Sequence, residues 1–177
     1  MAEAIEVSPG GGVKGGGSLW RFSLAFYERP GVPEALIALQ DRADLDVNLI
    51  LFALWLGISR CCLLTGEKLA AAERAVHLVR TEIVEPLRAM RRRLRPAPDA
   101  DVQGLRAGIK ALELAAEQVA QTRLGRLADP MVSDAADRAA RLAAASANLA
   151  RYLGPEMMRS TEADVIREAL EAWSRDQ

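Results

Sequence analysis

Apolar residues recur along most of the chain at intervals of three and four positions, which is the spacing of one face of an α-helix. This spacing predicts helices at about 19–29, 33–42, 46–58, 67–94, 102–127, 130–153 and 161–174. No segment shows the alternation of a credible strand. We therefore predict an all-α protein, a single helical bundle of about six or seven helices that spans residues 18–177.

The segment DLDVNLILFALWLG, residues 44–57, holds the most apolar of these helices. A membrane span needs about 20 apolar residues, so we expect a buried helix and no span. Asp44 or Asp46 is placed to accept hydrogen bonds from the free N–H groups at the helix start. Asn48 should bond a neighbouring backbone group. Together with the two helices before it, this helix should form the centre of the bundle.

Two later helices have apolar sets that predict which face turns inward. In 67–94, Pro86 should kink or divide the helix. Its apolar positions are Leu69, Ala72, Val76, Val79, Ile83, Leu87, Met90 and Leu94. In 102–127, the predicted inner side holds Leu105, Ile109, Leu112, Ala116, Val119 and Leu124, and the predicted outer side holds Lys110, Glu113, Glu117 and Gln121.

The connections and the N-terminus stand out by composition. Residues 1–17 are rich in glycine and predict a flexible tail. Residues 95–101 and 154–160 contain prolines or a Gly-Pro pair and predict internal linkers. The helix 130–153, whose expected start is Asp129 as cap with Pro130 in the first turn, has many small residues that would permit close helix approach.

Composition excludes several classes of function. The net charge of the 177 residues is −1, so no overall field attracts nucleic acid or anionic lipid. Cys61 and Cys62 are adjacent and form no disulfide framework and no C-x-x-C motif. The first 17 residues lack the pattern of a signal peptide. These features predict a cytoplasmic protein in a reducing compartment.

Catalytic chemistry has little support in the sequence. His77 is the only histidine, and it belongs to no H-E-x-x-H or E-x-x-H motif. A structural histidine is the simpler interpretation, and the sequence assigns no role to Cys61 or Cys62. We predict no catalytic residue and no cofactor, and we favour a protein that is not an enzyme.

The run RAMRRRLR, residues 88–95, is the most distinctive charged motif, with arginines at 88, 91, 92, 93 and 95. A bland interpretation is a solvated helix end whose cations complement the helix dipole. The functional interpretation is a contact for an acidic protein, RNA or anionic lipid. Aromatic residues for base stacking are absent nearby, which favours a protein over nucleic acid. The predicted partner-binding residues are Arg88, Arg91, Arg92, Arg93 and Arg95.

An alternative site is formed by Asp41, Asp44 and Asp46. Their spacing with Asn48 imitates the start of an EF-hand loop, but Leu49 and Trp55 stand where that loop needs glycine and glutamate. A looser grouping of the three aspartates would suit Mg²⁺. The alternative function is therefore a Mg²⁺-dependent enzyme, or a binder of an apolar or prenyl-type ligand, with its site inside the bundle.

Three stretches carry a resemblance to a known family: SLWRFSLAFYERPGV at 18–32, LQD at 39–41 and DVNLILFALWL at 46–56. Together they resemble an uncharacterised family of bacterial proteins defined as a domain of unknown function. The resemblance implies a small, all-helical bacterial protein in the cytoplasm. It supplies no catalytic residue, cofactor or substrate. The preferred hypothesis is a non-enzymatic interaction or adaptor protein that uses the basic amphipathic helix 67–94.

Overall fold

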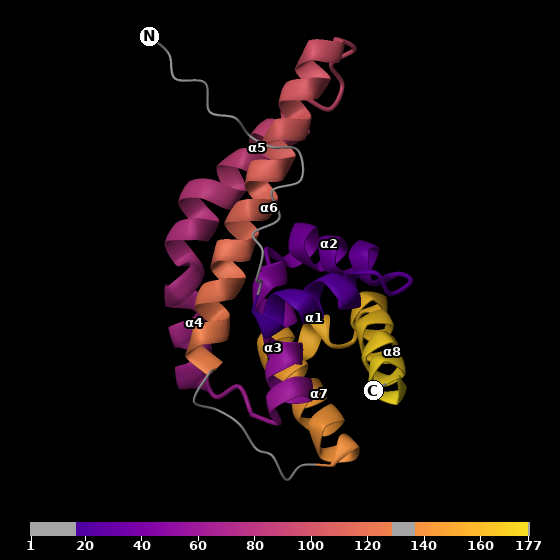
Figure 1. Cartoon of the computed structure of the whole chain (residues 1–177). Helices are drawn as coiled ribbons and strands as arrows, with labels where there is room; N and C mark the ends of the chain where they lie inside the picture. The colour runs from indigo at the N-terminus through magenta and orange to yellow at the C-terminus, as the bar shows by residue number, and fades with distance from the viewer. Residues whose placement is uncertain (1–16, 129–136, 177) are drawn as a thin grey trace.

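The computed structural model of the chain describes residues 17–128 and 137–176, and this part of the chain contains helices but no strand (Figure 1). The all-α prediction is confirmed. The helix that contains α4, η1 and α5 is continuous, so the described residues form seven helical segments, within the predicted number. In chain order they are α1 (Ser18–Tyr27), α2 (Val32–Ala43), α3 (Val47–Arg60), α4 (Gly66–Val79), the π-helical turn η1 (Arg80–Val84), α5 (Glu85–Arg93), α6 (Ala100–Ala128), α7 (Arg138–Met157) and α8 (Thr161–Arg175).

The predicted tail and linkers have different outcomes. Residues 1–16 of the tail, and the expected helix start at Asp129 and Pro130, lie outside the described residues. Residues 94–99 connect α5 to α6, whereas Ala100 and Asp101 of the predicted linker 95–101 belong to α6. The linker 154–160 is wrong in part: α7 continues to Met157, although Gly154 has a left-handed φ of 73° that interrupts its helical conformation.

The helices divide into two regions, which we call the body and the hairpin. The body consists of α1, α2, α3, α7 and α8. The hairpin consists of the continuous α4–η1–α5 helix and the antiparallel α6. Its far end, where α5 connects to α6, projects beyond the body (Figure 1). The other end of α6 packs against α1 and α3 and anchors the hairpin to the body.

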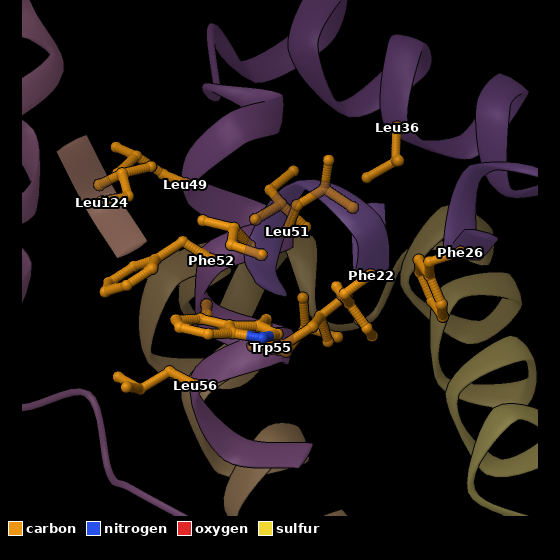
Figure 2. Close-up of a cluster of buried hydrophobic side chains, with 14 of the residues drawn as sticks. Phe22, Phe26, Leu36, Leu49, Leu51, Phe52, Trp55, Leu56 and Leu124 are labelled. Atoms are coloured by element: carbon orange, nitrogen blue, oxygen red, sulfur yellow. The ribbon is translucent and has the colours of Figure 1, made fainter. Parts of the chain in front are cut away.

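Helix α3 lies at the centre of the body, as predicted. Asp46 caps its start by accepting a hydrogen bond of 2.8 Å from the backbone N–H of Asn48. Every residue from Leu49 to Ile58 is buried. Figure 2 shows Phe52 and Trp55 of this helix among the other core side chains, with Phe22 and Phe26 of α1 nearby. A helix that is apolar on all sides is stable only when neighbours surround it.

Small residues let α7 approach α3 closely. A Cβ atom added to Gly57 would lie 2.2 Å from the Cα of Ala145, so only glycine fits at this crossing. The predicted role of small residues in this helix is thereby confirmed. Asn148 of α7 also donates hydrogen bonds to the carbonyls of Ala53 and Cys62, at 3.1 and 2.8 Å. The contact combines close packing with buried polar bonds.

A π-helical turn changes which side of the 66–93 helix faces inward. Ala72, Val76 and Val79 are buried as predicted. The next buried residue is Val84, whereas the predicted Ile83 is exposed. A π turn adds one residue to the helical repeat, so the inward face moves forward by one position. The turn directly precedes Pro86, where the sequence predicted a kink or division.

The predicted inner face of α6 is largely wrong. Ala116 and Leu124 are buried, but Leu105, Leu112 and Val119 are exposed. Glu113 and Gln121, predicted to face solvent, are buried instead. The physical reason is that polar partners meet these two side chains: arginines of α5 surround Glu113, and Gln121 donates to Asn48 across a distance of 3.0 Å. Asn48 therefore bonds a side chain rather than the predicted backbone group.

No helix in the described ranges 17–128 and 137–176 is long and apolar enough to cross a membrane.

Candidate partner-binding site

The three aspartates of the predicted metal site lie around the start of α3. Asp41 is near the end of α2, Asp44 follows that helix with a left-handed φ of 51°, and Asp46 caps α3. Each already has a partner within the protein. Asp41 accepts a hydrogen bond of 2.8 Å from Arg92. The carboxylate of Asp44 lies 3.0 Å from the guanidinium of Arg80, and Asp46 accepts a hydrogen bond from the backbone of α3.

No group of three or more histidine, cysteine, aspartate or glutamate side chains in the described part of the chain could hold a metal ion. The aspartates instead line a cleft of about 540 Å³ between the body and the hairpin. The opposite wall of the cleft carries Arg80, Arg88 and Arg92. The two alternative sites predicted from the sequence thus meet in one cleft, where their opposite charges face each other.

Two of the predicted partner-binding arginines hold the hairpin together. Arg88 donates to Glu113 at 2.9 Å and to Glu117 at 2.7 Å. Arg91 binds both carboxylate oxygens of Glu113, with its Nη2 3.2 Å from one of them. Glu113 is almost fully buried between the two helices. Bidentate contacts of this kind are among the stronger charge-assisted hydrogen bonds in proteins.

The surroundings of the two glutamates move their pKa values in opposite directions. Burial by itself would raise the pKa of Glu113, but the hydrogen bonds from Arg91 and Arg88 outweigh it and lower this pKa. Burial raises the pKa of Glu117, against the attraction of Arg88. The hydrogen bond to Glu113 in turn raises the pKa of Arg91. The network therefore favours the charged forms of Glu113 and Arg91 and disfavours the charged form of Glu117.

The remaining arginines of the run face solvent. Arg92 is half exposed although it pairs with Asp41. Arg93 and Arg95 are exposed, and no side chain among the described residues bonds either of them. Met90, 43% exposed, lies one helical turn before Arg93. We call the exposed side chains of Ile83, Pro86, Met90, Arg92, Arg93 and Arg95 the α5 surface.

A larger cavity of about 740 Å³ lies between α1, α3, α7 and α8. Its apolar wall includes Trp55, and its rim includes several arginines that already have contacts. Arg60 lies over the ring of Trp55, and the guanidinium of Arg138 donates to Ser174 at 3.1 Å. Arg141 donates to the carbonyl of Ser59 at 3.1 Å. Arg138 and Arg141 thus link α7 to α8 and to α3.

His77 and the two cysteines lie apart from the cleft. His77 is exposed on α4. Cys61 ends α3 with a left-handed φ of 50°, and its neighbour Cys62 donates a backbone hydrogen bond to Leu56. Both thiols are free and half-buried. The local geometry of the two cysteines is that of a helix end.

Sequence reasoning missed several residues of the cleft and of the network behind it. Glu113 and Glu117 are four positions apart on α6, and Arg88 and Arg91 are three apart on α5, so matched charges on two helix faces were a signal that could have been used. Tyr152 of α7, by contrast, had no recognisable signal in the sequence. Its hydroxyl accepts a hydrogen bond of 3.0 Å from the backbone N–H of Asp46, and burial raises its pKa.

No curated protein and no solved structure matches the chain. A family model described as "Protein of unknown function (DUF2390)" matches residues 18–124, from the start of α1 to the last turns of α6. Helices α7 and α8 lie beyond the matched range, although α7 packs closely on α3 within it. Since the match covers more than half of the chain, the protein belongs to this family of unknown function.

Proposed function

We propose that the protein is a non-enzymatic interaction protein, an adaptor that binds an acidic partner protein through the α5 surface. The observation that carries the proposal is the combination of exposed cations with exposed apolar side chains on one projecting helix. Arg93 and Arg95 are exposed there, and Met90 lies one helical turn before Arg93. Mixed contacts of this kind are typical of protein interfaces, in which arginine and methionine are enriched.

The ion pairs that the arginines of residues 88–95 form within the protein indicate which of these arginines are available to a partner. Arg88 and Arg91 are engaged by Glu113, so their contribution is to fix α5 against α6 rather than to contact the partner. Arg92 is shared, because Asp41 holds it while half of its side chain remains exposed. The partner contact then depends most on Arg93 and Arg95. Acidic groups on the partner would meet them without displacing an internal bond.

The charges in the cleft favour an interaction protein over a metal-dependent enzyme. Each of the three aspartates has an internal hydrogen-bond donor, and two of these donors are arginines. A cation would have to displace an arginine from Asp41 or Asp44 before it could use that carboxylate. The cleft supports a structural role in fixing the hairpin to the body.

The test uses the tagged full chain purified from its native host, with nuclease treatment, beside the variant Arg93→Glu/Arg95→Glu. The matched control is Arg151→Glu/Arg159→Glu, which makes the same change at two exposed arginines of the body. We expect a protein that co-purifies with the wild type and the control and is lost from the first variant. The recovered protein is then mixed with each purified chain to measure binding directly.

Equal binding to all three chains would contradict the α5 surface as the contact. Capture of nucleic acid instead of protein would contradict the proposed partner class. Melting temperatures of the three chains should agree, because neither pair of substituted arginines makes a side-chain bond to another described residue.

A further inference from the structure

Helix α6 carries a line of exposed apolar residues on the side that neither α5 nor the body covers. Leu105, Leu112 and Val119 recur at intervals of seven and are 66%, 56% and 47% exposed. Gly108 and Ala115, also exposed, lie between them. We call these five residues, with Asp101, Thr122 and Arg126 at the ends of the line, the outer stripe. Its positions alternate by four and three, which is the pattern of a helix that packs against another helix.

The outer stripe has no charged residue in its central part. From Leu105 to Val119 it offers only leucine, alanine, glycine and valine to solvent. No atom lies within 4 Å of the Cβ position of Gly108, so the surface is open at this point. A contiguous apolar surface of this kind is characteristic of an interface. The small side chains would let a second helix approach closely.

The charges at the two ends of the stripe indicate what covers it. Asp101 is exposed at the start of α6, and Arg126 is exposed near its end. An antiparallel second α6 would place each aspartate beside the arginine of the other copy. A parallel copy would place like charges together. We propose that the outer stripe is the interface with a second copy of this chain, packed antiparallel α6 against α6.

The same arrangement matches side-chain size along the stripe. When Asp101 faces Arg126 of the second copy, Leu105 faces Thr122, Gly108 faces Val119 and Leu112 faces Ala115. Each apolar layer then combines a larger side chain with a smaller one, as close antiparallel helix packing requires. The paired stretch of 26 residues, 101–126, is ~39 Å long at the α-helical rise. A two-fold axis through its middle makes one surface complementary to itself.

This dimer goes beyond the proposed function, because it uses a different face of the hairpin. The α5 surface, on the first helix of the hairpin, includes no residue of the outer stripe. A dimer would therefore present two α5 surfaces to partners. It would also cover leucines that the fold of one chain leaves in contact with water.

The full-length wild-type chain, Leu112→Arg and Leu114→Arg are compared by sedimentation equilibrium at micromolar concentration. Leu114 is also exposed but is not on the stripe, so it is the matched control. We expect a dimer for the wild type and for Leu114→Arg. Leu112→Arg should weaken dimerisation more than about 100-fold, because it buries a charge in the apolar interface. A monomeric wild type, or a dimer that survives Leu112→Arg, would overturn the proposal.

Charge exchange tests the antiparallel orientation. Asp101→Arg alone should weaken the dimer about five- to tenfold, because both ends then meet like charges. The double variant Asp101→Arg/Arg126→Asp should restore it. Failure of the double variant to restore dimerisation would overturn the antiparallel arrangement. Arg93→Glu/Arg95→Glu should remain dimeric, so loss of partner binding in that variant is distinguishable from loss of the dimer.

Discussion

The body and the far end of the hairpin, where α5 packs on α6, bury different kinds of side chain. In the body, α3 is buried mainly among apolar neighbours, and Trp55 and Phe26 have almost no exposed surface. In the hairpin, the buried contact between α5 and α6 is made by Arg88, Arg91 and Glu113, while α6 turns leucines toward solvent. Helix α5 has no fully buried residue.

This difference indicates how each region is stabilised. Burial of apolar surface contributes about 25 cal/mol per Å² and accumulates over the whole core of the body. Buried ion pairs contribute less, because desolvation of both partners offsets much of their attraction. We therefore expect the hairpin to open before the body unfolds. A helix pair that is held at its far end by ion pairs and carries apolar side chains on its outer surface is suited to binding another chain.

The close α3–α7 crossing offers the largest effect on the body. Gly57→Ala places a methyl group 2.2 Å from the backbone of Ala145 and should destabilise the protein by ~3 kcal/mol, because α3 and α7 must separate. Gly125→Ala is the matched control, since its Cβ position is open. It should stabilise α6 by ~0.5–1 kcal/mol. Urea unfolding measures both, and equal effects would contradict the described packing.

Removal of Glu113 should destabilise the hairpin and leave the stability of the body unchanged. Glu113→Ala removes the acceptor of Arg91 and one of the two acceptors of Arg88, and it should cost ~2–3 kcal/mol. Glu171→Ala changes an exposed glutamate of α8 and is the control. Hydrogen exchange followed by mass spectrometry should show lost protection in α5 and α6 and unchanged protection in α3. Uniform loss over the chain would mean that the hairpin and the body unfold together.

Acidification should change the stability of the hairpin, first through Glu117 and then, at lower pH, through Glu113. The pKa of Glu117 is raised, so its ionisation opposes folding at neutral pH, and its protonation on acidification removes that opposition. The pKa of Glu113 is lowered, so its contribution is complete above the ordinary glutamate value of about 4.3 and is lost as the pH falls through the lowered value.

We therefore expect hairpin stability to hold or rise slightly on acidification toward the ordinary glutamate value and to fall below it. Urea unfolding of the hairpin, followed across this range, measures the profile. In Glu113→Gln the decrease at low pH should be reduced. An unchanged decrease in that variant would show that other carboxylates control the acid response.

The smallest expected effect is that of Mg²⁺. Because Asp41 and Asp44 already pair with arginines, Mg²⁺ with diphosphate should leave the melting temperature of the chain within experimental scatter. A clear Mg²⁺-dependent increase, absent in Asp41→Asn, would favour the alternative of a metal-dependent site in the cleft.

Local signals in the sequence predicted the body better than the hairpin. The cap at Asp46 and the apolar run of α3 are contiguous features, so their structure could be read directly. In α6, alanine and glycine are so frequent that more than one face shows the spacing of a buried helix face. The exposed face that carries the leucines was therefore predicted to be the inner one. The structure identifies the inner face of α6, because Arg88 and Arg91 of α5 lie opposite Glu113 of α6. The extra residue of the π turn, which exposes Ile83, has no comparable local signal.

The most direct test of a hairpin whose exposed apolar stripe is covered by a second copy is hydrogen exchange of the wild-type chain at several protein concentrations. We expect faster exchange in α6 than in α3 in dilute solution. Exchange between Leu105 and Val119 should also slow as the concentration rises, while exchange in α3 stays constant. Exchange in α6 that is independent of concentration and as slow as in α3 would contradict the proposed dimer.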